Sequence, residues 1–189
     1  MARVILERED VVARLVDVFR EYGYGGTTVA RITARTGIGK GSLYHFFPEG
    51  KNAMAAAAIE HVRAWFEDNV YDGLRSGEDA TRRLDDMLDT VEAYFLRGGR
   101  VCLVGAFALG DARDLFANAI AGYFADWRAA LAQVFRECEA EDERCLAYAE
   151  LVLARIQGAL VLSRALDSEA AFTGEIERLR TEVKHYLAH

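Results

Sequence analysis

Side chains able to bind phosphate and base edges gather in one short segment near the N-terminus. Four of them lie within six residues: Lys40, Ser42, Tyr44 and His45. A fifth, Lys51, follows at the end of the segment. Lysine binds phosphate as a point charge, and hydroxyl and imidazole groups donate to phosphate oxygens or contact base edges. These residue types therefore indicate recognition of a nucleic acid rather than bond-breaking chemistry.

The element that precedes these side chains is a short helix, predicted over about residues 29–35. Thr27 and Thr28 stand just before it, where a threonine oxygen can accept a hydrogen bond from a free backbone N–H of the first turn. Gly37 ends the helix, because glycine adopts the left-handed conformation after a helix without a Cβ penalty. The sequence thus predicts a capped helix followed by a tight turn.

A second short helix, predicted over about residues 40–46, carries the polar side chains. Leu43, Phe46 and Phe47 can pack inward, which leaves the polar residues toward the solvent. Pro48 disfavours the α conformation at Phe47 and so closes the element. The two helices form a helix-turn-helix whose second helix has a short polar surface suited to DNA.

At these residues the chain resembles the tetracycline-repressor (TetR/AcrR) family of transcriptional regulators. The family pattern runs from an apolar first helix, through a threonine pair, to Gly-Ile/Val-x-Lys-Gly-Ser/Thr-Leu-Tyr-x-x-Phe, which here occupies residues 37–47. The match covers about residues 8–55. Two departures are Gly39, where the family often has serine, and Glu49, which places a negative charge close to where DNA phosphates would lie.

The resemblance implies contacts with a double-stranded DNA operator. Thr27 and Thr28 would touch phosphates at the start of the first short helix, and Lys51 would meet a phosphate at the start of the next long helix. The remaining four residues would meet the major groove and its flanking phosphates: Lys40, Ser42, Tyr44 and His45. The alternatives are a core position for Tyr44, a bystander role for His45 and an ordinary first-turn lysine at Lys51.

Composition predicts an all-α chain. Of its 189 residues 52% are apolar and one is proline, and strand-like alternation is absent. A first helix over about residues 7–22 carries Val12, Leu15, Val16 and Phe19 at helical spacing. Beyond the two short helices, further helices are predicted over about residues 51–75, 79–97, 103–109, 112–139, 143–166 and 171–187. About nine helices are expected in all. They form a helix-turn-helix DNA-binding domain, 1–50, and a helical ligand-binding and dimerisation domain, 51–189.

The formal charge is distributed unevenly along the chain. The net charge is −7, but residues 1–51 carry 8 Lys and Arg against 6 Asp and Glu, a net of +2. Residues 52–189 carry 15 against 24, a net of −9. An acidic body weakens indiscriminate DNA binding and leaves the attraction to DNA local to the helix-turn-helix.

Aromatic side chains are abundant between residues 65 and 127. Aromatic walls with a few polar tips suit a concave ligand site, although core packing is the alternative for any single residue. The predicted ligand-contacting residues are Trp65, Tyr94, Phe95, Cys102, Phe107, Tyr123 and Trp127. The resemblance implies a repressor released from a palindromic operator when a small apolar or aromatic molecule binds there. An activator, or an electrophile or redox sensor acting through Cys102, is the alternative.

The last two predicted helices, 143–166 and 171–187, are rich in apolar residues, and the second carries an apolar stripe at three-to-four spacing. A small-residue notch at Gly158 and Ala159 would allow a partner to approach. The family resemblance implies a homodimer held by a four-helix bundle of these helices. The alternative is that the stripe on residues 171–187 only seals the single chain.

Other function classes lack their signals. The histidines have no metal-ligand spacing: His45, His61, His185 and His189. The three cysteines, Cys102, Cys138 and Cys145, form no Cys-x-x-Cys pair, which predicts a reducing cytoplasm and no zinc site. No enzyme motif, metal or cofactor is expected, and no charge-free run of about 18 residues predicts a membrane partner. A helical protein-binding module is the second alternative.

Overall fold

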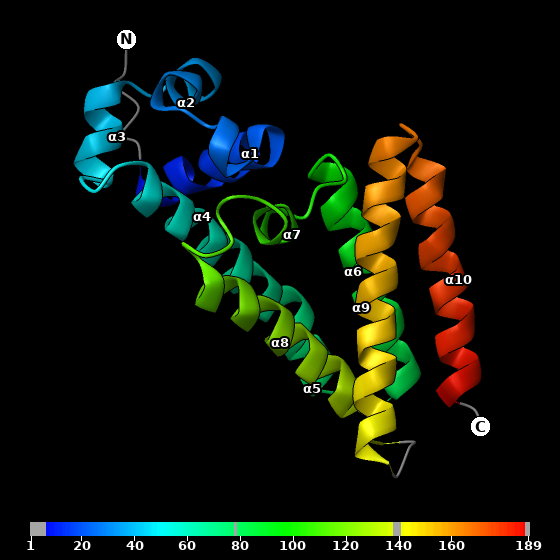
Figure 1. The fold of residues 1–189 in the computed structure, drawn as a ribbon. Helices are drawn as coiled ribbons and strands as arrows, with labels where there is room; N and C mark the ends of the chain where they lie inside the picture. The colour runs from blue at the N-terminus through cyan, green and yellow to red at the C-terminus, as the bar shows by residue number, and fades with distance from the viewer. Residues whose placement is uncertain (1–6, 78, 138–140, 188–189) are drawn as a thin grey trace. The chain divides into compact units, whose positions relative to one another are not determined.

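The computed structural model describes residues 7–77, 79–137 and 141–187 of the chain. Over these ranges the regular structure is helical, with no strand, which confirms the all-α prediction (Figure 1). Predictions that involve Cys138, residue 139 or His189 lie outside the described residues. The elements are α1 (Arg8–Gly26), α2 (Val29–Thr36), α3 (Lys40–Phe46), α4 (Lys51–Phe66), the π-helix η1 (Glu67–Tyr71), α5 (Asp72–Arg75), α6 (Ala80–Arg97), α7 (Leu103–Ala108), α8 (Ala117–Phe135), α9 (Asp142–Ala165) and α10 (Glu169–Leu187).

Local chemistry explains where the short helices begin and end. Thr28 caps α2 by accepting a hydrogen bond from the Arg31 backbone N–H at 3.2 Å. Gly37 ends α2 in the left-handed conformation, with φ of 71°, as the sequence predicted. Asp79 caps α6 by accepting from the Arg82 backbone N–H at 2.6 Å. These residues set the borders of α2 and α6 through contacts within a few positions of the chain.

Several helix borders differ from the predictions, and two of the differences show why. The helix predicted to start at residue 112 starts at Ala117, because residues 111–116 form turns. The first helix extends to Gly26 instead of residue 22, across a kink at Gly23 whose φ of 66° and ψ of 178° are not helical. Both differences fall at glycine-rich or turn-rich joints, where periodicity carries little information.

The described residues divide into two compact units by their contacts. The first unit contains the residues up to Ala64 together with Leu103–Ile120, and the second contains Trp65–Cys102 together with the residues from Ala121 onward. These units are defined by packing. The predicted functional boundary between residues 50 and 51 is a separate matter and stays a prediction.

The first unit is built around the apolar face of α1. Val12, Leu15, Val16 and Phe19, which were predicted to face inward, are all buried. The ring of Phe19 meets that of Phe107 on α7 edge to face, with centroids 5.7 Å apart. The helix-turn-helix therefore shares its core with α7, although α7 is more than fifty residues further along the chain.

The second unit is organised around α6, α9 and α10. The helices α9 and α10 run side by side in opposite directions, and α10 also packs on α6 (Figure 1). Phe172 of α10 meets Phe95 of α6 edge to face at 6.1 Å between centroids. At the border of this core, Arg155 of α9 forms ion pairs with Glu175 and Glu182 of α10. The pairing of α9 with α10 thus has an apolar centre and a charged edge.

One described helix, α9, is long and apolar enough to cross a membrane by length and composition alone. Its most apolar 18-residue window has a mean hydropathy of 1.6, and 39% of that window is buried. Core helices of proteins without a membrane segment meet the same criterion, so the feature is weak evidence for a membrane span.

Candidate nucleic-acid interface and small-molecule site

The helix α3 has one buried face and one exposed polar face. Leu43 is fully buried and anchors the helix to the first unit. The four predicted DNA contacts on this helix are all exposed: Lys40, Ser42, Tyr44 and His45. Tyr44 is 40% exposed and not a core residue, and Lys40 Nζ lies 5.8 Å from its ring centroid. The helix thus presents the predicted polar side chains together on one accessible surface.

The two threonines before α2 have different environments. Thr28 is exposed and caps the helix through its hydroxyl oxygen. Thr27 is fully buried, and its hydroxyl donates to the Gly23 carbonyl oxygen at 2.6 Å. A phosphate contact by the Thr27 side chain would require this turn to open, whereas Thr28 is accessible as it stands.

Lys51 is held by the end of α1. Its Nζ donates to the Tyr24 carbonyl oxygen at 3.1 Å and lies 4.0 Å from the centroid of the Tyr24 ring. The Tyr24 hydroxyl in turn donates to the Asn52 side-chain oxygen. Lys51 therefore joins the start of α4 to the end of α1, and a phosphate contact would add to this role or replace it.

Tyr24 is a residue that the sequence analysis missed. Its ring meets Phe107 at 6.0 Å and Phe116 at 5.7 Å between centroids, so it contacts α7 and the turn after it as well as Lys51. Burial raises the pKa of Tyr24, and the charge of Asp111 raises it further. The available signal was a single aromatic residue in the glycine-rich Gly23 to Gly26 stretch. We call Tyr24, Lys51, Asn52, Phe107 and Phe116 the Tyr24 contact group.

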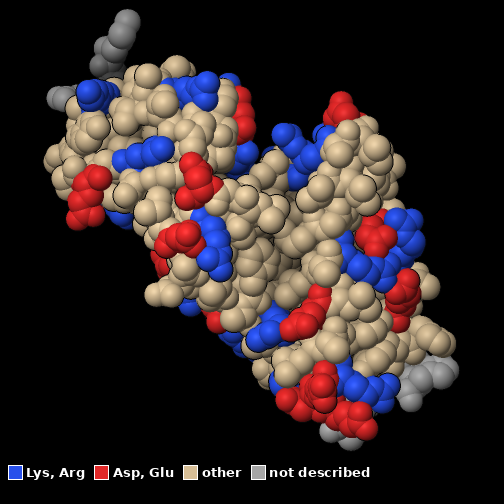
Figure 2. All heavy atoms as spheres, in the orientation of Figure 1, with Lys and Arg blue, Asp and Glu red and all other residues tan. Residues whose placement is uncertain are grey.

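Arginines of the same unit bind neighbouring groups. Arg35 forms an ion pair with Glu21 at 2.6 Å, and Arg14 donates to the Thr36 carbonyl oxygen at 2.9 Å. Arg31 donates to the Gly26 carbonyl oxygen at 2.5 Å. Figure 2 shows Lys and Arg side chains over the α1 to α3 end of the molecule, with acidic side chains among them. The basic character is thus mixed and local.

The predicted ligand-contacting residues divide between the two units. Phe107 belongs to the first unit, where its ring meets Phe19, Tyr24 and Phe116. The other six lie in the second unit: Trp65, Tyr94, Phe95, Cys102, Tyr123 and Trp127. In the sequence Phe107 looks like its neighbours in the aromatic run, and only the packing of α7 on α1 separates it from them.

Phe66 lies among the aromatic residues of the second unit. Its ring centroid is 5.0 to 5.1 Å from those of Tyr94, Tyr123 and Trp127. Trp65 stacks on Tyr94 at 4.3 Å, and both are half-buried. The rings of this cluster contact one another, so much of the aromatic surface serves as core.

Two buried polar groups belong to this cluster. The indole Nε1 of Trp127 has no hydrogen-bond partner among the described residues, and Trp127 is fully buried. Burial raises the pKa of Tyr123 well above its ordinary value, and the neighbouring Cys102 thiol raises it further. Cys102 itself is 7% exposed. A buried N–H without a partner costs free energy, so the Trp127 indole N–H is a candidate hydrogen-bond donor in this region.

The apolar stripes of α9 and α10 have different environments. Those of α10, namely Phe172, Ile176, Leu179 and Val183, are buried within the chain. On α9, several large apolar residues remain accessible, with exposures of 45% for Leu151, 60% for Val161 and 57% for Leu162. Gly158 on the same helix is exposed too. The apolar stripe of α10 is therefore covered within the single chain, as the alternative proposed, while α9 keeps an uncovered apolar face.

Two segments of the chain match known families. Residues 12–58 match the bacterial regulatory proteins of the tetR family, and residues 80–174 match the C-terminal domain of LmrA/YxaF-like transcriptional regulators. The chain is 24% identical over 161 residues to the HTH-type transcriptional regulator LmrA of Bacillus subtilis, which covers 82% of this chain and 85% of LmrA. It is 28% identical over 173 residues to the transcriptional repressor DhaR of Mycobacterium sp., covering 82% and 80%.

Solved structures share the fold. A TetR transcriptional regulator from Chloroflexus aurantiacus superimposes with a TM-score of 0.76 at 25% identity, covering 94% of this chain and 93% of that one. A cysteine variant of the TetR family regulator CifR, solved with 26-bp operator DNA, superimposes with a TM-score of 0.75 at 19% identity, covering 96% and 98%. The second similarity is one of fold.

Proposed function

The chain belongs to the TetR family of transcriptional regulators, and we propose that it is a ligand-responsive repressor that binds a palindromic operator as a homodimer. Members of the family are DNA-binding regulators and not enzymes, so the chain acts by binding DNA. We place it in the cytoplasm, with the DNA that it regulates. Repression, release by a small apolar or aromatic effector, and dimerisation through α9 are the parts that extend beyond the family assignment.

The exposed polar face of α3 is the observation that carries the DNA-binding proposal. Leu43 is buried on one face of the helix, and the accessible side carries Lys40, Ser42, Tyr44 and His45. A major groove admits one helix, and a few side chains on so short a helix must contact the base edges. Thr28 and Lys51 are proposed to contact phosphates at the two flanks, which sets the position on DNA without specifying sequence.

The effector proposal rests on the aromatic cluster of the second unit. Trp65 and Tyr94 form a stack that is half-buried, and Trp127 has a buried indole N–H without a described partner. A small molecule with an acceptor atom would satisfy that N–H. The proposed contact residues in this unit are Trp65, Tyr94, Phe95, Cys102, Tyr123 and Trp127. The seventh predicted contact, Phe107, lies in the first unit and stays a prediction.

The dimer proposal rests on α9. A helix face that exposes Leu151, Val161 and Leu162 beside Gly158 provides apolar surface and close approach for a second copy of the same helix. Exposed contiguous apolar surface on a soluble chain marks an interaction site. The apolar residues of α10 are used within the chain, so α10 would contribute to the bundle through its partially exposed residues.

The redox alternative receives less support from the geometry. Cys102 is 7% exposed, and Arg100, the cation that would lower its pKa, forms an ion pair with Asp167 at 3.1 Å. A reactive thiol needs access and a free neighbouring positive charge. Reversible oxidation of Cys102 is therefore the second candidate, to be distinguished by whether peroxide releases the operator.

One experiment tests the proposal as a whole. The operator is selected from random duplexes, and sedimentation then gives the mass of the protein–DNA complex. Two protomers on one palindromic duplex, with half-sites about 34–36 Å apart or somewhat more, are expected. A single protomer bound tightly to one half-site would contradict the dimer, and a library of apolar compounds that leaves the complex intact would contradict the effector.

A further inference from the structure

The side chain of Lys51 is held in one position by the end of α1. Its Nζ donates to the Tyr24 carbonyl oxygen at 3.1 Å and lies 4.0 Å from the centroid of the Tyr24 ring. This carbonyl is in the last turn of α1, and it also accepts a hydrogen bond from the Thr27 backbone N–H at 3.2 Å. A carbonyl at the C-terminal end of a helix and the face of an aromatic ring both stabilise a cation. Tyr24 thus provides two favourable contacts for one ammonium group.

Tyr24 is itself fixed by other elements of the first unit. Its hydroxyl donates to the Asn52 side-chain oxygen on α4. Its ring meets the rings of Phe107 and Phe116 edge to face, with centroids 6.0 and 5.7 Å away. The ring cannot rotate away from the ammonium without losing contacts with α4, with α7 and with the turn before α8. The position of Lys51 is therefore set by the packing of the whole Tyr24 contact group.

The held ammonium remains available to an anion. An ammonium group has three N–H donors, and the carbonyl oxygen and the ring face occupy two of them. Lys51 is half-buried and so keeps access to solvent. It directly follows Gly50, where an added Cβ would lie 3.8 Å from Cε1 of Tyr44. The start of α4 is thus next to the exposed face of α3, and Lys51 has a donor left for a phosphate at the edge of that face.

Ordering a lysine before it binds increases its contribution to affinity. The long and flexible stem of lysine loses rotamer freedom when its ammonium is fixed on a partner. A stem that is already ordered by folding loses less freedom on binding, so the affinity is higher. A carbonyl dipole and a ring quadrupole stabilise the ammonium without neutralising its charge. The attraction of Lys51 for a phosphate is therefore retained.

We propose that Tyr24 is a positioning residue for DNA binding, which holds the Lys51 ammonium where one of its N–H groups reaches a phosphate of the operator. The inference rests on the proposed DNA-binding function and adds to it a residue that acts through Lys51. Tyr22 provides a matched contrast on the same helix. It is also half-buried, but its ring contacts the Arg31 guanidinium, with Cζ 5.0 Å from the ring centroid.

A double-mutant cycle in operator binding tests the proposal. The operator duplex is selected from random sequences, and fluorescence anisotropy gives the affinities of Tyr24→Leu, Lys51→Met and the double variant. Tyr24→Leu should weaken binding about three- to tenfold when Lys51 is present, and less than about twofold in the Lys51→Met background. Tyr24→Phe keeps the ring and the carbonyl, so its affinity should be close to that of the unaltered chain. Tyr22→Leu should have the same effect in both backgrounds.

Two results of the cycle would overturn the proposal. Equal losses for Tyr24→Leu with and without Lys51 would show that the ring acts only through the stability of the fold. Tighter binding by Tyr24→Leu would show that the contact with Tyr24 keeps the lysine away from DNA. Failure of the unaltered chain to bind any duplex would instead contradict the proposed function, so the two failures are distinguishable.

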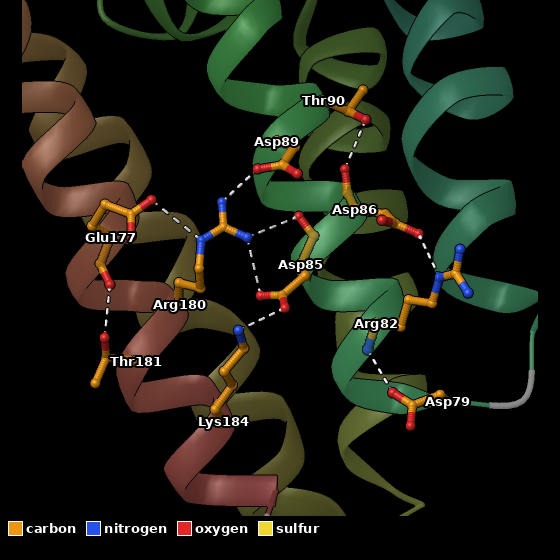
Figure 3. Close-up of polar contacts among 10 residues, drawn as sticks. All are labelled: Asp79, Arg82, Asp85, Asp86, Asp89, Thr90, Glu177, Arg180, Thr181 and Lys184. Atoms are coloured by element: carbon orange, nitrogen blue, oxygen red, sulfur yellow. Dashed lines mark hydrogen bonds and ion pairs between the residues drawn. The ribbon is translucent and has the colours of Figure 1, made fainter.

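Lysine resonances provide a measurement on the unaltered chain, which does not depend on the folding of Tyr24→Leu. The sequence has three lysines, Lys40, Lys51 and Lys184. Lys184 is the internal reference, because its Nζ forms an ion pair with Asp85 of α6 at 2.7 Å (Figure 3). The ring current of Tyr24 should shift the Lys51 ε-methylene protons upfield of those of Lys184, and the shift should persist when the operator duplex is added. A Lys51 resonance that lacks this shift, or that loses it when DNA binds, would contradict the positioning role.

Discussion

The helices α3 and α9 each bury one face and expose the other, but the exposed faces have opposite character. On α3 the accessible side chains are polar, with Lys40, Ser42 and His45 around Tyr44. On α9 the accessible side chains are apolar, with Leu151, Val161 and Leu162 around Gly158. A polar, basic face suits a hydrated anionic partner such as DNA, and an apolar face suits a second protein surface. The comparison shows that the side chains that remain exposed after folding indicate the kind of partner that each helix can bind.

The largest expected effect comes from giving α9 the polarity of α3. Leu162→Glu places one unpaired carboxylate from each protomer in the proposed dimer interface, at a cost of about 3–5 kcal/mol for each buried charge. We expect a monomer in sedimentation and loss of binding to the full operator. Leu109→Glu is the control, because Leu109 is 87% exposed and lies off α9. A Leu162→Glu protein that remains dimeric would place the interface elsewhere.

A smaller effect is expected from removing the aromatic residue at the centre of the α3 surface. Tyr44→Ala should weaken operator binding by about 1–3 kcal/mol and leave the melting temperature nearly unchanged, because the side chain is 40% exposed. Fluorescence anisotropy with labelled operator gives the affinity. Tyr44→Phe retains the ring and separates the hydroxyl contribution from stacking. Unaltered affinity in Tyr44→Ala would show that the exposed face of α3 is not the DNA-reading face.

Lys51 tests whether one side chain can both contact a DNA phosphate and stabilise the first unit. As a phosphate contact, Lys51→Ala should weaken all DNA sequences alike and reduce the salt slope by about one unit. The structure adds a stability effect, because Lys51 donates to the Tyr24 carbonyl oxygen. Measurement of the salt slope and the melting temperature separates the two roles. A lower melting temperature with an unchanged slope would assign Lys51 to the Tyr24 contact group alone.

The smallest effect concerns the covered side of α9 and α10. Burial raises the pKa of Glu175, but the hydrogen bonds from Arg155 and Arg178 outweigh it, so the net pKa is lowered. Its stabilising contribution is therefore present at neutral pH and is lost as the pH falls through the lowered pKa. Glu175→Gln should lower the free energy of unfolding at pH 7 by less than about 1 kcal/mol, which lowers the melting temperature. The melting temperature of the variant should also decrease less steeply as the pH falls.

Glu92 is the matched contrast, because its pKa shift has the opposite sign. Burial and the charge of Glu177 raise the pKa of Glu92, with Asp89 adding to the shift and Arg180 opposing it. The ionised form is thus disfavoured in the folded chain, and Glu92→Gln should slightly raise stability at neutral pH. Thermal melting of both variants gives the comparison. Equal responses in Glu175→Gln and Glu92→Gln would contradict the electrostatic environments assigned to the two carboxylates.

Local spacing was sufficient to predict most helices of the fold and the surface of α3, but not the π-helix η1 within the helix predicted over residues 51–75. The threonine pair, Gly37 and Pro48 act on backbone groups within a few positions, so the borders of α2 and α3 could be inferred from the residues themselves. Leu43 was predicted inward and its polar neighbours outward, and both are found. Prediction was poorer at residues 111–116, which form turns before α8 begins, although the helix was predicted to start at about residue 112.

The sequence by itself determined the all-α class, the helix-turn-helix and the polar surface of α3, because caps, turn residues and helical periodicity act over one or two turns of chain. Only the tertiary structure decided which apolar stripes are covered. It buried the stripe of α10, it left one apolar face of α9 accessible while burying the other, and it placed Phe107 beside Tyr24. Apolar burial is non-directional, so periodicity shows that a face is apolar but cannot say which distant element covers it.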